Sequence, residues 1–158
     1  GLVSTADLKE AVESGKVARY ITDFPDDETL QIPNVIAVPH LGASTKESET
    51  NCAIMAVNQV REFLEEGTIK NSVNFPEAFL DRNGGTRILI ANKNIPNMVS
   101  QISNILASAN LNIDNMLNKK HEDIAYNIID LTQNHIDEGI KTKLEAIEGV
   151  LMVRIIQD

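Results

Sequence analysis

The sequence has little of what several classes of protein require. Its 158 residues contain one cysteine, Cys52, which cannot form an internal disulfide and agrees with a reducing compartment. No apolar run approaches the roughly 20 residues of a membrane span. The first residues do not have the basic-then-apolar pattern of a signal peptide. We therefore expect a cytoplasmic protein with no membrane partner.

Clustered positive charge and metal-site spacings are also missing. Lys and Arg number 14 against 23 Asp and Glu, for a formal net charge of -9, and the basic residues are spread thinly along the chain. Nucleic acid is therefore not an expected partner. No spacing typical of metal ligands occurs, and the 8 glycines include no Gly-x-Gly-x-x-Gly loop. We expect no metal site.

Residues 1–70 show the order of elements found in part of a parallel α/β sheet. Ser4 followed by Asp7 is a capping pattern that predicts a short helix. Residues 17–21 and 35–38 are apolar without clean alternation, which is typical of strands buried on both faces of a parallel sheet. Because so few strands and helices leave sheet edges open, this half is predicted to be a partial Rossmann-type segment of a longer protein.

A long helix is predicted next. Ser44 with Glu47 is a second capping pattern, and Gly67 marks the expected end. Apolar side chains recur along one stripe of this helix: Ala53, Val57, Val60 and Leu64. An exposed stripe of this kind predicts contact with a partner. Residues 71–85, which include Pro76 and lack periodicity, are expected to be a linker.

Residues 86–158 alternate strands and helices in the order β-α-β-β-α-β. Strands are predicted at 86–91, 113–119, 124–131 and 150–156, and helices at 96–109 and 136–147. This order is the split unit of ferredoxin-like folds, an antiparallel sheet covered on one face by two helices. The predicted fold class is therefore α/β, with a partial parallel-sheet segment followed by a complete ferredoxin-like domain that binds a small ligand.

His40 is the titratable group best placed for chemistry. It follows a predicted buried strand and precedes a helix, at the carboxyl edge where open α/β sheets bind ligands. A histidine exchanges protons near neutral pH, and one of the carboxylates at residues 26–28 could orient it. One histidine and a nearby acidic loop in the sequence more often have no catalytic role. In that case the histidine is hydrogen-bonded to backbone groups in its loop and the acidic loop is simply solvated. Both interpretations stay open on this ground.

The turn at residues 92–97 is the candidate ligand site of the second half. It joins a strand to a helix that begins near Pro96, and the free amide groups at a helix start attract a carboxylate. Asn94 could cap this helix or bind a polar ligand. Asn112, at the start of the next strand, leaves the same alternatives open.

Several segments, taken in order, resemble one protein family. They are Gly1-Leu2-Val3-Ser4, Ser14-Gly15-Lys16-Val17-Ala18, Asp23-Phe24-Pro25, Asn34-Val35-Ile36-Ala37-Val38-Pro39-His40-Leu41-Gly42-Ala43-Ser44-Thr45 and Ser72-Val73-Asn74-Phe75-Pro76. With the second domain they are similar to NAD-dependent D-2-hydroxyacid dehydrogenases. Within that family they resemble members that oxidise 3-phosphoglycerate to 3-phosphohydroxypyruvate in L-serine biosynthesis and end in an ACT domain. The resemblance implies a carboxyl-terminal fragment that lacks the upstream substrate arginine and dinucleotide loop and is inactive alone.

The resemblance implies roles for residues in the first half. His40 matches the catalytic acid/base histidine. Asp27 matches the carboxylate that supports it, with Glu28 one place along. The residues implied to bind NAD are Thr22, Asp23, His40, Leu41, Gly42 and Ala43.

In the second half the resemblance implies an allosteric site for L-serine. Asn94 and Asn112 match serine contacts, Asn92 stands where a histidine is common, and Asn97 replaces a glycine. ACT domains of this family pair across a two-fold axis with the ligand at the subunit interface, so a homodimer or homotetramer is expected. A competing hypothesis is a fragment that acts only as an amino-acid-binding, dimerising regulatory module.

Overall fold

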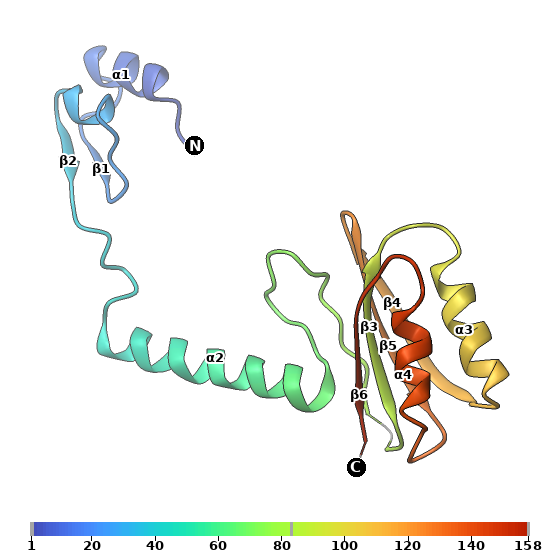
Figure 1. Cartoon of the computed structure of the whole chain (residues 1–158). Coiled ribbons are helices and arrows are strands. Elements are labelled where there is room, and N and C mark those ends of the chain that lie inside the picture. Colours follow the sequence, from blue (N-terminus) through green and yellow to red (C-terminus); the bar gives the residue numbers. More distant parts are fainter. Residues whose placement is uncertain (1, 83, 158) are drawn as a thin grey trace. The chain divides into compact units, whose positions relative to one another are not determined.

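The computed structural model describes residues 2–82 and 84–157, so Gly1, Asn83 and Asp158 lie outside the described residues. The chain divides into two compact units, residues 1–53 and 54–158 (Figure 1). This division differs from the sequence prediction, which placed a linker at residues 71–85. None of the helices in the described ranges combines the length and apolar character that a membrane span needs.

A short capped helix opens the first unit. α1 (Thr5–Glu13) begins after Ser4, whose Oγ accepts a hydrogen bond from the amide of Asp7 at 3.4 Å, as predicted. Leu8 and Val12 lie one turn apart and are buried. They form a small apolar core with the loop that precedes the second strand.

Two short parallel strands follow α1. They are β1 (Tyr20–Thr22) and β2 (Val35–Ala37), and they pair in parallel as predicted. They are not buried on both faces as predicted, since Ile21 is 63% and Ile36 is 42% exposed. β1 begins later than predicted because Val17 packs against the small core and does not pair with a neighbour. The carboxyl ends of both strands therefore meet at one edge of this small sheet.

A single turn of 3-10 helix, η1 (Thr29–Gln31), lies between the two strands. The amide of Thr29 donates to Oδ1 of Asp26 at 2.6 Å. Hydrogen bonds from the Thr29 side chain and backbone hold the pKa of Asp26 below its ordinary value, because they favour the ionised carboxylate.

The long predicted helix is α2 (Lys46–Glu66), and the boundary between the two units falls within it. The predicted cap was Ser44, but Thr45 caps the first turn instead, since the Ser48 amide donates to Thr45 Oγ1 at 3.2 Å. α2 ends at Gly67, whose φ of +75° is the left-handed backbone typical of a helix end. None of the residues of α2, all of them described, is buried. Its apolar stripe is more than half exposed at Ile54, Val57, Val60 and Leu64.

The second unit has the predicted βαββαβ order. Its strands are β3 (Arg87–Lys93), β4 (Ile113–His121), β5 (Ile124–Leu131) and β6 (Val150–Ile156). They form one antiparallel sheet in the order β4-β5-β3-β6. The two helices, α3 (Met98–Ser108) and α4 (Gly139–Glu145), lie on the same face of that sheet (Figure 1). The arrangement is that of a ferredoxin-like domain.

Both faces of this sheet are covered. On one face Ile88 and Ile90 of β3 pack with Ile102 of α3 and Leu144 of α4. On the other face, the intervening side chains of β3 and β5 pack against residues from the segment after α2. That second cluster is Ile69, Ala78, Leu89, Ala91, Tyr126 and Ile128.

The predicted linker is part of this second cover. Ile69 and Ala78 exchange two backbone hydrogen bonds, at 2.8 and 3.1 Å, so the chain doubles back on itself across the sheet. The hydroxyl of Tyr126 donates to the carbonyl of Gly67 at 2.8 Å. Burial raises the pKa of Tyr126 to about 12, although the charges of Arg154 and Arg87 act in the opposite direction.

Candidate functional sites

The first candidate site lies at the carboxyl edge of the small parallel sheet. Asp23 directly follows β1 and His40 is the third residue after β2, so the parallel pairing brings them to the same edge. His40 Nδ1 lies 2.8 Å from Asp23 Oδ2. The ring of Phe24 contacts the imidazole, with centroids 4.4 Å apart. Two polar side chains that are far apart in the sequence thus meet in space, with an aromatic ring beside them.

The geometry of this pair orients the histidine. When Nδ1–H donates to Asp23, the opposite nitrogen, Nε2, remains available to accept or release a proton. About half of each side chain is exposed, 55% for His40 and 47% for Asp23, so the pair is open to a ligand and to solvent. The hydroxyl of Thr22 accepts a hydrogen bond from the Phe24 amide at 3.1 Å and shapes the turn that presents Asp23.

Asp27, the expected partner of His40, lies elsewhere. With Glu28 it lines a separate surface hollow beside α1. The structure brings Asp23 to His40 instead, because Asp23 stands at the strand end whereas Asp27 comes after the Phe-Pro turn and leads into η1. The remaining predicted cofactor residues, Leu41, Gly42 and Ala43, form an exposed turn in which the Ser44 amide donates to the Leu41 carbonyl at 3.0 Å.

The second candidate site is a pocket of about 160 Å³ at the start of α3. Its walls are uncharged and include four asparagines; the lining residues are Asn92, Asn94, Ile95, Asn97, Met98, Val99, Ser100, Asn118 and Ala125. Asn97 has φ +71°, the left-handed backbone for which asparagine is among the better-suited residues, so it can stand where the resemblance implies glycine. It makes no side-chain cap, which leaves the first amides of α3 for a ligand within the described part of the chain.

Three asparagine side chains form a hydrogen-bonded row across the sheet behind this pocket. Asn118 Nδ2 donates to Asn127 Oδ1 at 2.5 Å, and Asn127 Nδ2 donates to Asn92 Oδ1 at 2.7 Å. Asn92 Nδ2 then donates to the carbonyl of Lys93 at 2.6 Å. Asn92 and Asn127 are buried, so the row fixes the direction in which the Asn92 amide faces.

Asn118 and Asn127 were not among the residues expected at this site. The β4–β5 hairpin turns at Glu122 and Asp123, so that His121 pairs with Ile124 and Asn118 lies directly opposite Asn127. A turn two residues longer, as the predicted end of the strand at residue 119 implies, would have placed Asn118 opposite Ala125, so the predicted strand bounds did not bring the two asparagines together.

Asn94 and Asn112, the predicted effector contacts, lie at different ends of the sheet. Asn94 does not cap α3: its amide N–H donates to Asp123 O at 2.8 Å, and its side chain donates to Glu122 O at 3.3 Å. Asn112 Nδ2 donates to Thr132 Oγ1 at 3.0 Å, at the far end of β4 from Asn94. One chain by itself does not bring the two asparagines together.

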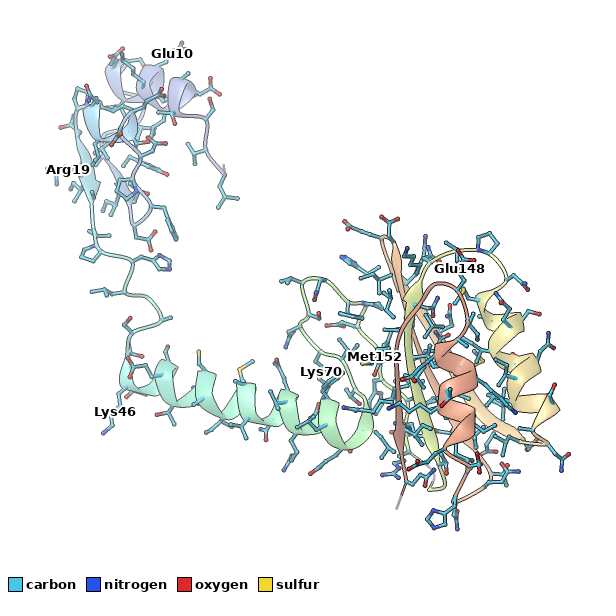
Figure 2. All side chains as sticks on the ribbon, in the orientation of Figure 1. Glu10, Arg19, Lys46, Lys70, Glu148 and Met152 are labelled. Atoms are coloured by element: carbon cyan, nitrogen blue, oxygen red, sulfur yellow. The ribbon has the colours of Figure 1, made fainter. Side chains whose placement is uncertain are left out.

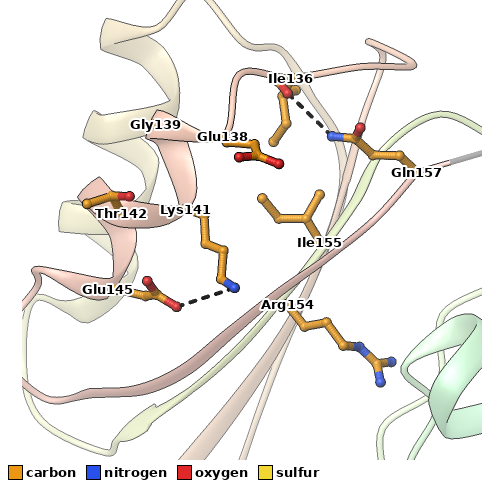
Figure 3. Close-up of a pocket in the computed structure, with 9 residues that line it drawn as sticks. All are labelled: Ile136, Glu138, Gly139, Lys141, Thr142, Glu145, Arg154, Ile155 and Gln157. Carbon is orange, nitrogen blue, oxygen red and sulfur yellow. Dashed lines mark hydrogen bonds and ion pairs between the residues drawn. The ribbon is translucent and has the colours of Figure 1, made fainter.

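A larger surface hollow, about 710 Å³, lies between α4 and β6 (Figure 3). Two of its exposed charges pair with each other, in the Lys141–Glu145 contact of 3.8 Å. The guanidinium of Arg154 extends away from α4 (Figure 3), and it stacks 4.6 Å from the centre of the Phe63 ring. This hollow therefore lacks converging groups. No cluster of three or more potential metal ligands occurs among residues 2–82 and 84–157.

The two units define an α/β protein in which a parallel-sheet segment precedes a ferredoxin-like βαββαβ domain. No family model matches the chain. Over most of its length the chain resembles D-3-phosphoglycerate dehydrogenase, which confirms the resemblance noted in the sequence. It is 32% identical to the Haemophilus influenzae enzyme in an alignment that covers 94% of this chain and 39% of that protein. It is 29% identical to D-3-phosphoglycerate dehydrogenase 2 of Saccharomyces cerevisiae, over 98% of this chain and 38% of that protein.

The chain thus spans well under half the length of these curated relatives, which are enzymes. Among solved structures, the ACT domain of a GTP pyrophosphokinase from Chlorobium tepidum superimposes with a TM-score of 0.40 at 19% identity. The superposition covers 45% of this chain and 95% of that domain.

Proposed function

We propose that this chain is the carboxyl-terminal, effector-sensing part of an NAD-dependent enzyme that oxidises 3-phosphoglycerate to 3-phosphohydroxypyruvate in the cytoplasm. The observation that carries the proposal is one continuous alignment that runs through both units, covering 94% of the chain, to a relative of that name. The same relative is therefore matched by residues of both units. The His40 edge and the asparagine-lined pocket then take the catalytic and regulatory roles.

In this proposal His40 is the acid/base group. Its Nε2 would take the proton of the substrate hydroxyl, because Asp23 occupies Nδ1 and would stabilise the imidazolium that forms. Asp27 remains the alternative support that the resemblance implies. The conservative variant His40→Gln would keep a hydrogen bond to Asp23 and lose proton transfer.

The residues at this edge fit one flank of a nicotinamide group. The carboxylate of Asp23, the hydroxyl of Thr22 and the exposed 40–43 turn offer polar contacts, and Phe24 offers an exposed ring. Bound NAD would supply the hydride acceptor. This chain holds no glycine-rich dinucleotide loop, so we expect it to need the remaining part of the enzyme for tight cofactor binding. Formation of NADH by the purified chain with 3-phosphoglycerate would refute that expectation.

The pocket at the start of α3 is the proposed effector site, with L-serine as the effector. The first amides of α3 would receive the carboxylate, since a helix start favours negative charge. The amide oxygens of Asn92, Asn94 and Asn118 would receive the ammonium and hydroxyl groups. A volume of about 160 Å³ and neutral walls suit a small zwitterion.

A homodimer would complete this site. β4 is an edge strand of the sheet, and its side chains are largely exposed. Two copies pairing along β4 in antiparallel fashion would place the second copy's β4 start, where Asn112 lies, near the end of the strand that reaches the pocket. This arrangement would reconcile the separation of Asn94 and Asn112 within one chain.

Calorimetric titration with L-serine, run beside sedimentation equilibrium, tests the effector site. We expect saturable heat and a dimer, with the heat abolished in Asn94→Ala and weakened in Asn112→Ala. Asn58→Ala on the exposed α2 is the matched control and should bind as wild type. Serine heat without turnover favours a purely regulatory module for this chain, and an unaltered Asn94→Ala titration would contradict the site.

A further inference from the structure

Another cavity in residues 54–158 is separate from the proposed effector pocket and from the hollow between α4 and β6. It has a volume of about 400 Å³ and lies where the end of α2 and the segment after it meet the sheet face opposite α3 and α4. Figure 2 labels Lys70 and Met152 on the two sides of this meeting point. Most of the lining is apolar: Val60, Phe63, Ile69, Phe75, Tyr126 and Met152. A lining of this kind, with few polar groups, is typical of small-molecule sites.

One polar group in the wall of this cavity has no partner. Thr68 lines the cavity, is 2% exposed, and its Oγ1 has no hydrogen-bond partner among the described residues. A buried hydroxyl is nearly always paired in folded proteins, because leaving it unpaired costs free energy. The other two hydroxyls of the lining already donate hydrogen bonds, that of Tyr126 to the Gly67 carbonyl and that of Ser72 to Asn74 Oδ1. The Thr68 hydroxyl is therefore a buried donor of this wall that has no partner among the described residues.

Charge at the rim is already balanced. Lys70 lies in the lining, and its Nζ is 2.6 Å from Glu62 Oε2. A charged ligand would have to displace one member of that pair, whereas a neutral ligand would leave it intact. The remaining polar lining groups, Gln59 and Ser72, carry no charge.

We propose that this cavity binds a small, uncharged, mainly apolar molecule. Its single hydrogen-bond acceptor, a carbonyl or ether oxygen, accepts a hydrogen bond from the Thr68 hydroxyl. The apolar body would lie between Val60, Phe75 and Met152. Because one wall comes from α2 with the segment after it and the other from β5 and β6, the bound molecule joins these elements and stabilises their packing.

Acetophenone is a suitable probe because it is an uncharged aryl ketone, and ethylbenzene is its matched control without the acceptor. Binding to the full chain is followed by chemical-shift changes of the Met152 and Thr68 methyl groups. We expect saturable shifts with acetophenone and a weaker affinity for ethylbenzene by roughly threefold to tenfold, the worth of one net hydrogen bond. Absence of saturable shifts with acetophenone overturns the proposal.

Two variants locate the site and its acceptor. Thr68→Val keeps the side-chain shape, so it should fold normally and bind the two probes with equal affinity. Val60→Phe, at a half-exposed position of α2, should fill the cavity and abolish binding of both probes. Asn94→Ala, in the effector pocket, should leave acetophenone binding unchanged, which separates this site from the proposed function. A Thr68→Val protein that still prefers acetophenone, or a Val60→Phe protein that still binds it, overturns the proposal.

Discussion

Replacing Arg87 by methionine removes a buried charge while keeping much of the side-chain volume. Arg87 on β3 and Asp130 on β5 stand directly opposite each other and are 0% and 1% exposed. The guanidinium contacts both carboxylate oxygens, Nε to Oδ1 at 2.6 Å and Nη2 to Oδ2 at 2.7 Å. After the substitution the Asp130 carboxylate is buried without a counter-charge, which is the costly half of a broken pair.

The magnitude follows from what each bond contributes. Removing one partner of a buried ion pair costs about 3–5 kcal/mol. Arg87 also donates to Glu66 O at 2.9 Å and to Asp81 O at 3.2 Å, and each such bond adds about 1 kcal/mol or less after exchange with water. We expect Arg87→Met to lower the free energy of unfolding of the second unit by about 4–6 kcal/mol.

Hydrogen exchange of the β3 and β5 amides in the full chain measures this loss. The double variant Arg87→Met/Asp130→Leu removes both charges and should regain most of the loss, because a buried pair replaced by apolar groups is often neutral. Lys141→Met is the control, since its pair with Glu145 is exposed and worth about 0.3–0.5 kcal/mol. A loss in Arg87→Met no larger than in the control, or no recovery in the double variant, would refute the reasoning.

Three further perturbations have defined outcomes. Tyr126 should ionise near pH 12, and the measurement is a tyrosinate absorbance that is missing from the Tyr126→Phe variant. Because the pKa is raised in the folded state, its contribution to the stability of the second unit is fully present below pH 10. This contribution should be lost as the pH rises from 10 to about 12. Asp26→Ala should speed exchange of the Thr29 amide at neutral pH. In wild type the same protection should fall only below the ordinary pKa of 3.8, because the folded-state pKa is depressed. Gly67→Ala should destabilise the second unit by about 1–2 kcal/mol in urea denaturation, since φ is +75° and the new Cβ would overlap the Leu89 side chain.

The second unit was predictable because its hydrophobic periods match its burial. The inward positions Met98 and Ile102 of α3 are buried as their helical spacing predicts. The sequence predicts a linker at residues 71–85, and this segment itself gives no indication that part of it packs against the sheet, because a chain that folds back on itself has no simple hydrophobic period. The missed signal was in β3, where residues 88–91 are apolar without alternation and are buried on both faces. A strand of that kind requires a second cover, and the segment after α2 supplies it.

The candidate sites show a different limit. Aligning Phe24 and Pro25 with the family pattern points to Asp27 as the partner of His40, whereas in the structure the ends of the parallel strands bring Asp23 to His40. Two residues close together in sequence can face different directions when a turn separates them. Contacts between distant residues were also beyond sequence reasoning: Arg87 and Asp130 are 43 positions apart, and nothing local marks either as the other's partner. Their complementary charges become informative only after the strand pairing is known.

The end of α2 is held by side chains from three strands of the sheet. Arg154 of β6 donates to the carbonyl of Phe63, Arg87 of β3 donates to that of Glu66, and Tyr126 of β5 donates to that of Gly67. These carbonyls belong to the helix terminus, where partners are scarce and positive charge is favourable. Because most of the apolar stripe of the helix is exposed, α2 is attached to the sheet mainly through its last turns, where Phe63 also stacks with Arg154. Any ligand that shifts β3, β5 or β6 would therefore act on α2 through these three bonds.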